Sequence, residues 1–222
     1  MDVEALERAK ACTESVRGET VPKGRHLSRI ELQALVTACE RDSSPAGVRD
    51  ALIIALLAAG LRRNEVAEAQ LQDLELKASA LVVRGKGNKE RIIFVVGGGR
   101  VALDAWLQLR GNEPGSLFFA INKSGVVQAG SGLSSQSVYK ALLKRAEEAK
   151  VEVKPHDLRR TLIGEAFTAG VDVATIQRIV GHSSPATTSR YDRRNDEVKR
   201  AALGLLSIDF KHAWSAETPH AR

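Results

Sequence analysis

The chain has few of the residues that build metal centres, disulfide frameworks or membrane spans. Its 222 residues include two cysteines, Cys12 and Cys39, which lack metal-type spacing and have no matching Cys/His cluster. We interpret them as reduced thiols of a cytoplasmic protein, with one disulfide between them as the alternative. The longest apolar run, residues 51–59, is shorter than the roughly 20 residues that a bilayer span needs. It predicts a buried helix, and because no signal peptide opens the chain we expect a cytoplasmic location.

Aromatic residues make up only 4% of the chain, and its two tyrosines have very different neighbours. Tyr139 is followed by two leucines at i+3 and i+4, which is typical of a core position in a helix. Tyr191 instead lies between Arg190 and the charged run 192–194. A phenol among charges is not placed like a core aromatic, so Tyr191 requires a functional explanation.

The rest of the composition describes a folded, basic protein. Hydrophobic residues make up 43% of the chain and charges of both signs are mixed, as in globular proteins. The formal net charge of +6 and the pI near 9.5 favour a polyanionic partner, most often nucleic acid. This charge signal is weak by itself, because many basic proteins bind no nucleic acid.

The hydrophobic periodicity predicts a mostly helical α+β fold. Ser28 and Glu31 match a capping box, from which a helix should run to about Arg41. A second helix should begin at Ser44 and contain the apolar run described above. The β-branched runs 80–84 and 91–96 predict two antiparallel strands joined by a Gly-rich turn. Further helices are predicted around Trp106, from Ser135, and from residue 156 onward.

We divide the chain into three parts. Residues 26–206 should form the main domain. Residues 1–25 are polar, are broken by glycine and proline, and predict a short helix and a linker that are too brief to fold alone. Residues 207–222 form a C-terminal tail.

Four short stretches carry the chemical signal. They are GLRRNE at 60–65, GKGNKER at 85–91, PHDLRR at 155–160 and GHSSPATTSRY at 181–191. In this order, and with nine residues from His182 to Tyr191, they resemble the tyrosine recombinase family, the phage-integrase-like enzymes that cut and rejoin DNA through a phosphotyrosine. The resemblance covers about residues 26–206 and implies the fold of the family's catalytic domain. Residues 1–25 resemble the end of the helical domain that precedes it in the family.

The resemblance also implies roles for individual residues. The implied catalytic residues are Arg62, Lys86, His156, Arg159, His182 and Tyr191, with Tyr191 as the nucleophile and Lys86 as the catalytic lysine. Glu65 corresponds to the acidic companion of the first arginine. The neighbouring cations that we expect to contact DNA are Arg84, Lys89, Arg91 and Arg160.

The chemistry of phosphodiester cleavage explains why these residue types would gather. Negative charge grows on the phosphate oxygens and on the leaving oxygen, and fixed cations stabilise it. An arginine is always charged and its planar fork grips two phosphate oxygens, so Arg62 and Arg159 could act without a metal ion. Because an arginine cannot release a proton, Lys86 would protonate the leaving 5′ oxygen, and His156 could accept the proton of Tyr191. No metal and no ATP are then needed, because the phosphotyrosine keeps the energy of the ester.

Other interpretations remain for the same residues. Each motif alone could be a surface charge, a solvated turn or a helix cap. The segment 169–191 also has the pattern of a helix-turn-helix, so a non-catalytic DNA-binding regulator is the main alternative. A metal-dependent nuclease is a third, but no carboxylate pair or His/Asp cluster has ligand-like spacing.

The resemblance implies partners as well as chemistry. We expect the chain to bind double-stranded DNA weakly and with strong salt dependence, because the preceding domain of the family is missing. We expect a monomer in free solution and a tetramer on DNA, assembled through the tail 207–222. Accessory DNA-bending proteins and a bacterial or phage-type, nucleoid-associated location are part of the same expectation.

Overall fold

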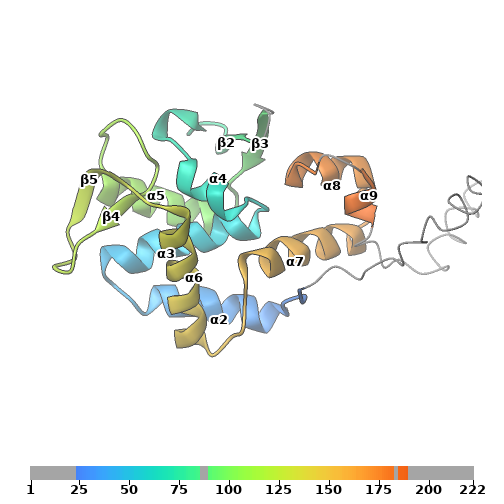
Figure 1. Ribbon diagram of the computed structural model, residues 1–222, viewed down its shortest axis with the longest axis horizontal. Helices are drawn as coiled ribbons and strands as arrows, with labels where there is room; N and C mark the ends of the chain where they lie inside the picture. The colour runs from blue at the N-terminus through green and yellow to red at the C-terminus, as the bar shows by residue number, and fades with distance from the viewer. Residues whose placement is uncertain (1–23, 86–89, 183–184, 190–222) are drawn as a thin grey trace, which may run out of the picture. The chain divides into compact units, whose positions relative to one another are not determined.

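The computed structural model describes residues 24–85, 90–182 and 185–189 (Figure 1). The chain divides into two compact units, Met1–Asp192 and Arg193–Arg222, and every described residue lies in the first. The helices are α2 (Arg29–Glu40), α3 (Pro45–Ala58), α4 (Arg63–Glu68), α5 (Gly98–Arg110), α6 (Ser135–Ala149), α7 (Pro155–Thr168), α8 (Val173–Val180) and α9 (Pro185–Ser189). The strands are β1 (Leu74–Glu75), β2 (Ala80–Arg84), β3 (Glu90–Phe94), β4 (Phe119–Ile121) and β5 (Val127–Gly132). None of the helices in this part of the chain has the length and apolar character needed to cross a membrane.

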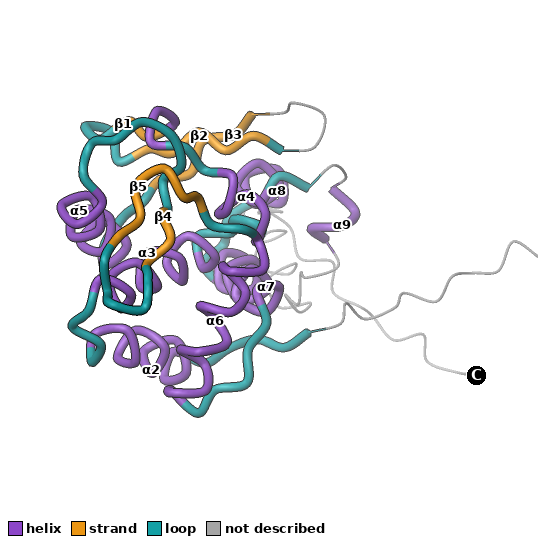
Figure 2. Tube along the Cα trace, turned by 60° about the vertical axis from the view of Figure 1, so that its left-hand side comes forward, coloured by secondary structure: helices purple, strands orange, loops and turns teal. Residues whose placement is uncertain are grey.

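The first two helices begin where the sequence predicts. Ser28 Oγ accepts a hydrogen bond from the amide of Glu31, and the Glu31 carboxylate accepts one from the amide of Ser28, so the capping box is confirmed. Ser44 Oγ accepts from the amide of Ala46 at the start of α3. α3 is buried along most of its length because nearly all its residues are apolar, and α2, α5, α6 and α7 pack around it (Figure 2). The predicted core helix is therefore the centre of the main hydrophobic core.

The predicted hairpin forms two strands of a three-stranded antiparallel sheet with the order β1-β2-β3. Val83 pairs with Arg91 and Leu81 pairs with Ile93, so these side chains share one face. Leu81, Val83 and Ile93 are buried on that face. The sheet therefore packs on the core through one side of the hairpin.

A second sheet, formed by β4 and β5, was not predicted from the sequence. β5 has the sequence VQAGSG, which contains two glycines and a single β-branched residue, and most of it is exposed. The pair packs on the main core through Phe118, which precedes β4, and through Ile121 and Val127 of the two strands. Trp106 stacks on Phe118 with ring centroids 6.2 Å apart and donates through Nε1 to the carbonyl of Leu117.

The C-terminal helices form a small second core beside the sheet. Ile163 and Phe167 of α7 pack with Ile176 and Val180 of α8. Asp172 caps α8 by accepting from the amide of Thr175 at 2.8 Å. α8 contacts both α7 and β3, and this places its C-terminal end beside the hairpin (Figures 1 and 2).

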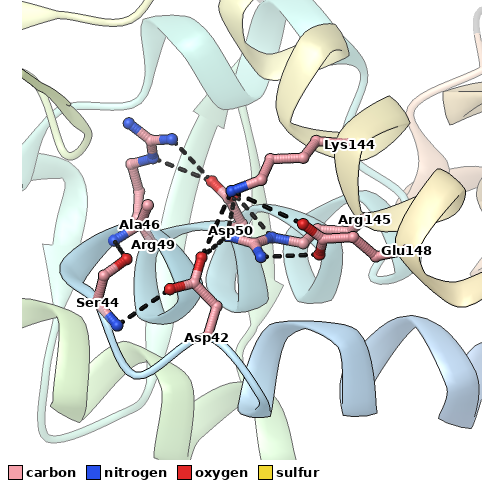
Figure 3. Close-up of polar contacts among 8 residues, drawn as sticks. All are labelled: Asp42, Ser44, Ala46, Arg49, Asp50, Lys144, Arg145 and Glu148. Carbon is pink, nitrogen blue, oxygen red and sulfur yellow. Dashed lines mark hydrogen bonds and ion pairs between the residues drawn. The ribbon is translucent and has the colours of Figure 1, made fainter. Parts of the chain in front are cut away.

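A buried ion network joins α6 to α3 and to the loop before it (Figure 3). The side chain of Arg145 is completely buried and donates to Asp42, Asp50 and Glu148. Asp50 also accepts two hydrogen bonds from Arg49. Hydrogen bonds from Ser44 and from Arg145 hold the pKa of Asp42 below its usual range. Opposite charges are therefore matched within the network, which is the condition for burying them.

Candidate active site

Eight of the eleven residues that the sequence analysis selected lie in the described part of the chain. In the sequence, Lys86 and Lys89 come between β2 and β3 and Tyr191 comes after α9, and all three lie outside the described residues. Their predicted roles stay predictions.

Arg62 and Arg159 are anchored to the same turn although 97 positions separate them in the sequence. Arg159 donates to the carbonyl of Val180, and Arg62 donates to the next carbonyl, that of Gly181, at 2.9 Å. Arg159 also donates to the carbonyl of Gly60, at the corner that precedes Arg62. The turn at the end of α8 thus binds both guanidinium groups, through two consecutive carbonyls.

The glycines at these corners have backbone conformations that other residues rarely adopt. Gly181 ends α8 with φ of +65°, and Gly60 ends the turn after α3 with φ of +95°. A Cβ atom on Gly60 would lie 2.9 Å from Leu162, too close for an unstrained contact. The two turns can therefore present their carbonyl groups to the arginines because glycine occupies both positions.

The side chain of Arg159 lies in the protein interior, with only 2% of its surface exposed. The carbonyl groups of Gly60 and Val180 orient it, and because a carbonyl is neutral it does not cancel the charge of the guanidinium. That charge acts on both histidines of the motifs, since it lowers the pKa of His156 and the pKa of His182. The geometry therefore creates a positive potential at this site.

His156 lies on the first turn of α7, three residues before Arg159. Desolvation of its ring, followed by the charges of Arg159 and Arg62, lowers its pKa below the ordinary value for histidine. An imidazole with such a pKa is mostly neutral at pH 7. It can therefore accept a proton there.

His182 follows Gly181 directly, at the end of α8. Burial and the nearby charges of Arg159 and Arg62 lower its pKa to about 4. Its Nδ1 lies 2.9 Å from the hydroxyl of Thr188, which is fully buried in α9. This hydrogen bond fixes the ring orientation. Thr188 was not selected from the sequence, where it resembles any other polar residue of the stretch.

Glu65 binds two arginines at once. Arg91 donates to both of its carboxylate oxygens, at 2.9 and 2.6 Å, while Arg62 donates to it through Nη1 at 2.8 Å and through its backbone amide at 2.7 Å. Burial of the Glu65 carboxylate raises its pKa, but the bonds from Arg91 and Arg62 outweigh that effect and lower the pKa to about 2. Glu65 therefore stays ionised and holds Arg62.

The described residues among the predicted DNA contacts have different surroundings. Arg84 lies on the hairpin with its side chain 47% exposed, and it forms ion pairs with Asp73 and Glu90. Arg91 is 10% exposed and binds Glu65. Arg160 is buried and donates to the carbonyl of Gly24. Arg91 and Arg160 are thus held inside the protein, whereas Arg84 is at the surface.

The resulting arrangement combines guanidinium and imidazole groups from all four motifs. Arg62, Arg91 and Arg159 supply positive charge, and His156 and His182 supply neutral imidazoles. Such a set can bind an anion and stabilise negative charge that develops on it. Among the residues described, no three or more His, Cys, Asp or Glu side chains are grouped as ligands for a metal ion.

Comparisons with known proteins agree with the resemblance seen in the sequence. Residues 25–198 match the Phage integrase family. The tyrosine recombinase XerA of Thermococcus kodakarensis is 31% identical over 193 residues, which cover 85% of this chain and 66% of that protein. The chain spans between 52% and 67% of the length of eight curated relatives that it matches.

Two solved structures show how far the fold is shared. The recombinase XerH bound to its difH substrate superimposes with a TM-score of 0.68 at 21% identity, over 86% of this chain and 56% of that one. The catalytic domain of bacteriophage HP1 integrase superimposes with a TM-score of 0.57 at 18% identity, over 82% of this chain and 95% of that domain. The predicted fold class, a mostly helical α+β catalytic domain, is confirmed.

Proposed function

Because the chain belongs to the phage integrase family, we propose that it is a site-specific DNA recombinase that cleaves and rejoins DNA through a covalent 3′-phosphotyrosine. The observation that carries the proposal is the pairing of Arg62 and Arg159 on consecutive carbonyl groups of one turn. A surface charge or a helix cap has no need for such an arrangement. Two adjacent guanidinium groups match the oxygens of one phosphate.

In the proposed reaction Arg62 and Arg159 bind the non-bridging oxygens of the scissile phosphate. The oxygen of Tyr191 attacks phosphorus, and its proton passes to His156, whose lowered pKa leaves it neutral and able to accept it. The bond from phosphorus to the 5′ oxygen breaks, and Lys86 protonates that oxygen. His182, fixed by Thr188, donates a hydrogen bond to the phosphate.

The products of this step are a 5′ hydroxyl and a phosphotyrosine. Rejoining is the reverse reaction with the 5′ hydroxyl of a second strand, so the number of phosphoester bonds does not change. The proposal therefore includes no metal ion and no ATP. The arginines, which carry fixed charge, supply the stabilisation that metal ions supply in other nucleases.

The proposed partner is double-stranded DNA, as in the solved complex of XerH with its difH substrate. We propose that residues 26–206 act as the catalytic domain, that the free chain is a monomer, and that the tail 207–222 assembles a tetramer on DNA. Accessory DNA-bending proteins and a cytoplasmic, nucleoid-associated location belong to the same proposal. The net charge of +6 supports a DNA partner.

The test is to incubate the protein with nicked suicide-type DNA in the presence of a chelator and to look for a protease-sensitive covalent adduct. We expect an adduct with the wild-type protein. Tyr191→Phe should bind DNA and form none. Tyr139→Phe is the matched control, because Tyr139 is half-buried on α6 under the guanidinium of Arg63 and should not affect the reaction.

Three outcomes contradict the proposal in different ways. A DNA-binding regulator gives no adduct with any of the three proteins. A metal-dependent nuclease gives cleavage only when the chelator is left out. An adduct formed by Tyr191→Phe would exclude Tyr191 as the nucleophile.

A further inference from the structure

Arg91 has the position of a framework residue rather than that of a DNA contact. It lies on β3 in phase with Ile93 and Val95, on the face of the hairpin that packs on the core. Its side chain is 10% exposed. Besides binding Glu65, it donates through Nε to the carbonyl of Ile179 at 3.0 Å. The three contacts link the hairpin, α4 and the end of α8.

The turn at Gly181 is fitted closely around the Arg91 side chain. A Cβ atom on Gly181 would lie 3.1 Å from both Cδ and Nη1 of Arg91. The same turn accepts the hydrogen bond from Arg62 and precedes His182. Arg91 therefore contacts the turn that binds Arg62 and precedes His182. Its own guanidinium group donates to Glu65 and to the carbonyl of Ile179.

Arg62, Glu65 and Arg91 form a charge cluster, and the balance of its charges suggests a specific role for Arg91. Glu65 carries one negative charge at neutral pH, because its pKa is about 2. Among the described residues, Arg62 and Arg91 form ion pairs with this carboxylate. Without Arg91, the pair of Glu65 and Arg62 would have no net charge. With Arg91 present, two guanidinium groups face one carboxylate, and one net positive charge remains. The side chain of Arg62 is the exposed member, at 45%.

Arg62 also keeps donors for an anion. A guanidinium has five N–H donors. In the described structure the Arg62 side chain uses one for Glu65 and one for the carbonyl of Gly181. Its orientation is thus fixed by these two bonds, and its remaining donors and its charge can serve a phosphate.

We propose that Arg91 is a positioning residue that neutralises Glu65, so that Glu65 orients Arg62 without cancelling the charge that Arg62 offers to the scissile phosphate. The inference rests on the proposed function, because it assigns Arg91 a part in the same reaction. Arg91 acts through Glu65 and the turn at Gly181, and it does not contact DNA itself.

The decisive experiment measures adduct formation in single turnover on suicide DNA, as the maximal rate and the half-saturating DNA concentration. Arg91→Gln should lower the maximal rate by about 10- to 100-fold, less than the ~10²–10³ that loss of a direct donor costs, with half-saturation changed by less than about threefold. Arg91→Lys keeps the charge and should lose less. The double variant Glu65→Gln with Arg91→Gln should be faster than Arg91→Gln alone, because no carboxylate then cancels the charge of Arg62.

The control is Arg100→Gln. Arg100 also binds a carboxylate, that of Asp104, and a backbone carbonyl, that of Leu76, but it lies on α5 outside the cluster. Its maximal rate should equal that of the wild type. Thermal melting of every variant separates loss of rate from loss of fold. The double variant removes the charges of Arg91 and Glu65 together, so its rate can still be compared with that of the wild type if Arg91→Gln unfolds.

Two results would overturn the inference. If Arg91→Gln raises the half-saturating DNA concentration and leaves the maximal rate unchanged, Arg91 is a phosphate contact. If the double variant is no faster than Arg91→Gln, neutralisation of Glu65 is not its role.

A measurement on the free protein separates this inference from the proposed function. The ring of His182 is titrated by NMR in the wild type, Arg91→Gln, Arg91→Lys and the double variant. The pKa of His182 should rise in Arg91→Gln and stay near the wild-type value in the other two, since positive charge at the site is lost only in the first. If the wild type forms no adduct but the variants show this order of pKa values, the charge balance is supported and the proposed function is contradicted. If the pKa of His182 is unchanged in Arg91→Gln, the charge balance itself is contradicted.

Discussion

Two buried arginines of this protein are held in opposite ways. Arg145 is surrounded by carboxylates, those of Asp42, Asp50 and Glu148. Arg159 is nearly as buried, at 2% exposure, and donates to the backbone carbonyls of Gly60 and Val180. The carboxylates neutralise the first charge. Neutral carbonyl groups help to orient the second one, and its charge lowers the pKa of His156 and the pKa of His182.

The difference separates stability from function. A buried ion pair with matched charges contributes to the framework, because removing one partner leaves the other unpaired in the interior. The charge of a buried cation such as Arg159 acts strongly on groups near it. Here it reaches His156 and His182, where it lowers both pKa values. We therefore expect substitutions at the two arginines to affect different measurements.

The largest effect on stability is expected at Arg145. Arg145→Met leaves Asp50, which is 1% exposed, with fewer partners in the interior. Loss of one partner of a buried ion pair costs about 3–5 kcal/mol. Chemical denaturation should show this loss, while the single-turnover rate of the folded protein stays at the wild-type value. A rate that falls as far as the stability would mean that the two regions are not separate.

The converse result is expected at Arg159. Arg159→Lys keeps the charge, but an ammonium group cannot reproduce the fork that reaches the carbonyls of both Gly60 and Val180. We expect adduct formation to slow by about 10²–10³-fold, the range for loss of a donor that stabilises charge in the transition state. The melting temperature should change much less than in Arg145→Met. An unchanged rate with a large loss of stability would contradict the comparison.

Features that depend on local sequence and features that depend on distant contacts differ in how far the sequence predicts them. The capping box at Ser28, the helix start at Ser44 and the pairing of the two hairpin strands depend on local patterns, and each is confirmed. The site motifs could be selected because their residue types are unusual and their order resembles one family. Position 91 carried a further signal: it is in phase with the buried residues of β3, so its inward orientation could have been predicted from the alternation.

The remaining features depend on contacts between distant segments. Arg145 meets Asp42 across 103 positions, and nothing in either local sequence distinguishes these charges from solvated ones. The sheet of β4 and β5 was missed because its second strand has only one β-branched residue, and the sheet packs on the core through Phe118, Ile121 and Val127. A glycine inside a helix weakens it, but at Gly164 in α7 a Cβ atom would lie 3.1 Å from the ring of His26. Its packing role is a property of the folded chain.

The smallest expected effect is a dependence of stability on pH that belongs to the site and not to the ion network. The folded pKa of His182, about 4, lies below its ordinary value of 6.5, so the unfolded chain binds a proton that the folded chain excludes as pH falls through this window. Stability should therefore fall from pH 6.5 toward pH 4, by on the order of 1 kcal/mol because the ring is partly exposed. His182→Gln should remove this component of the denaturation curve.

The ion network should respond at lower pH. The pKa of Asp42 is held below its ordinary value of 3.8, so its contribution is present above that value and is lost only as pH falls further. Arg145→Met should thus leave the slope between pH 6.5 and pH 5 unchanged while His182→Gln flattens it. If Arg145→Met flattened the slope and His182→Gln did not, the groups that titrate in this range would be the carboxylates around Arg145. The pH dependence would then belong to the ion network and not to the site.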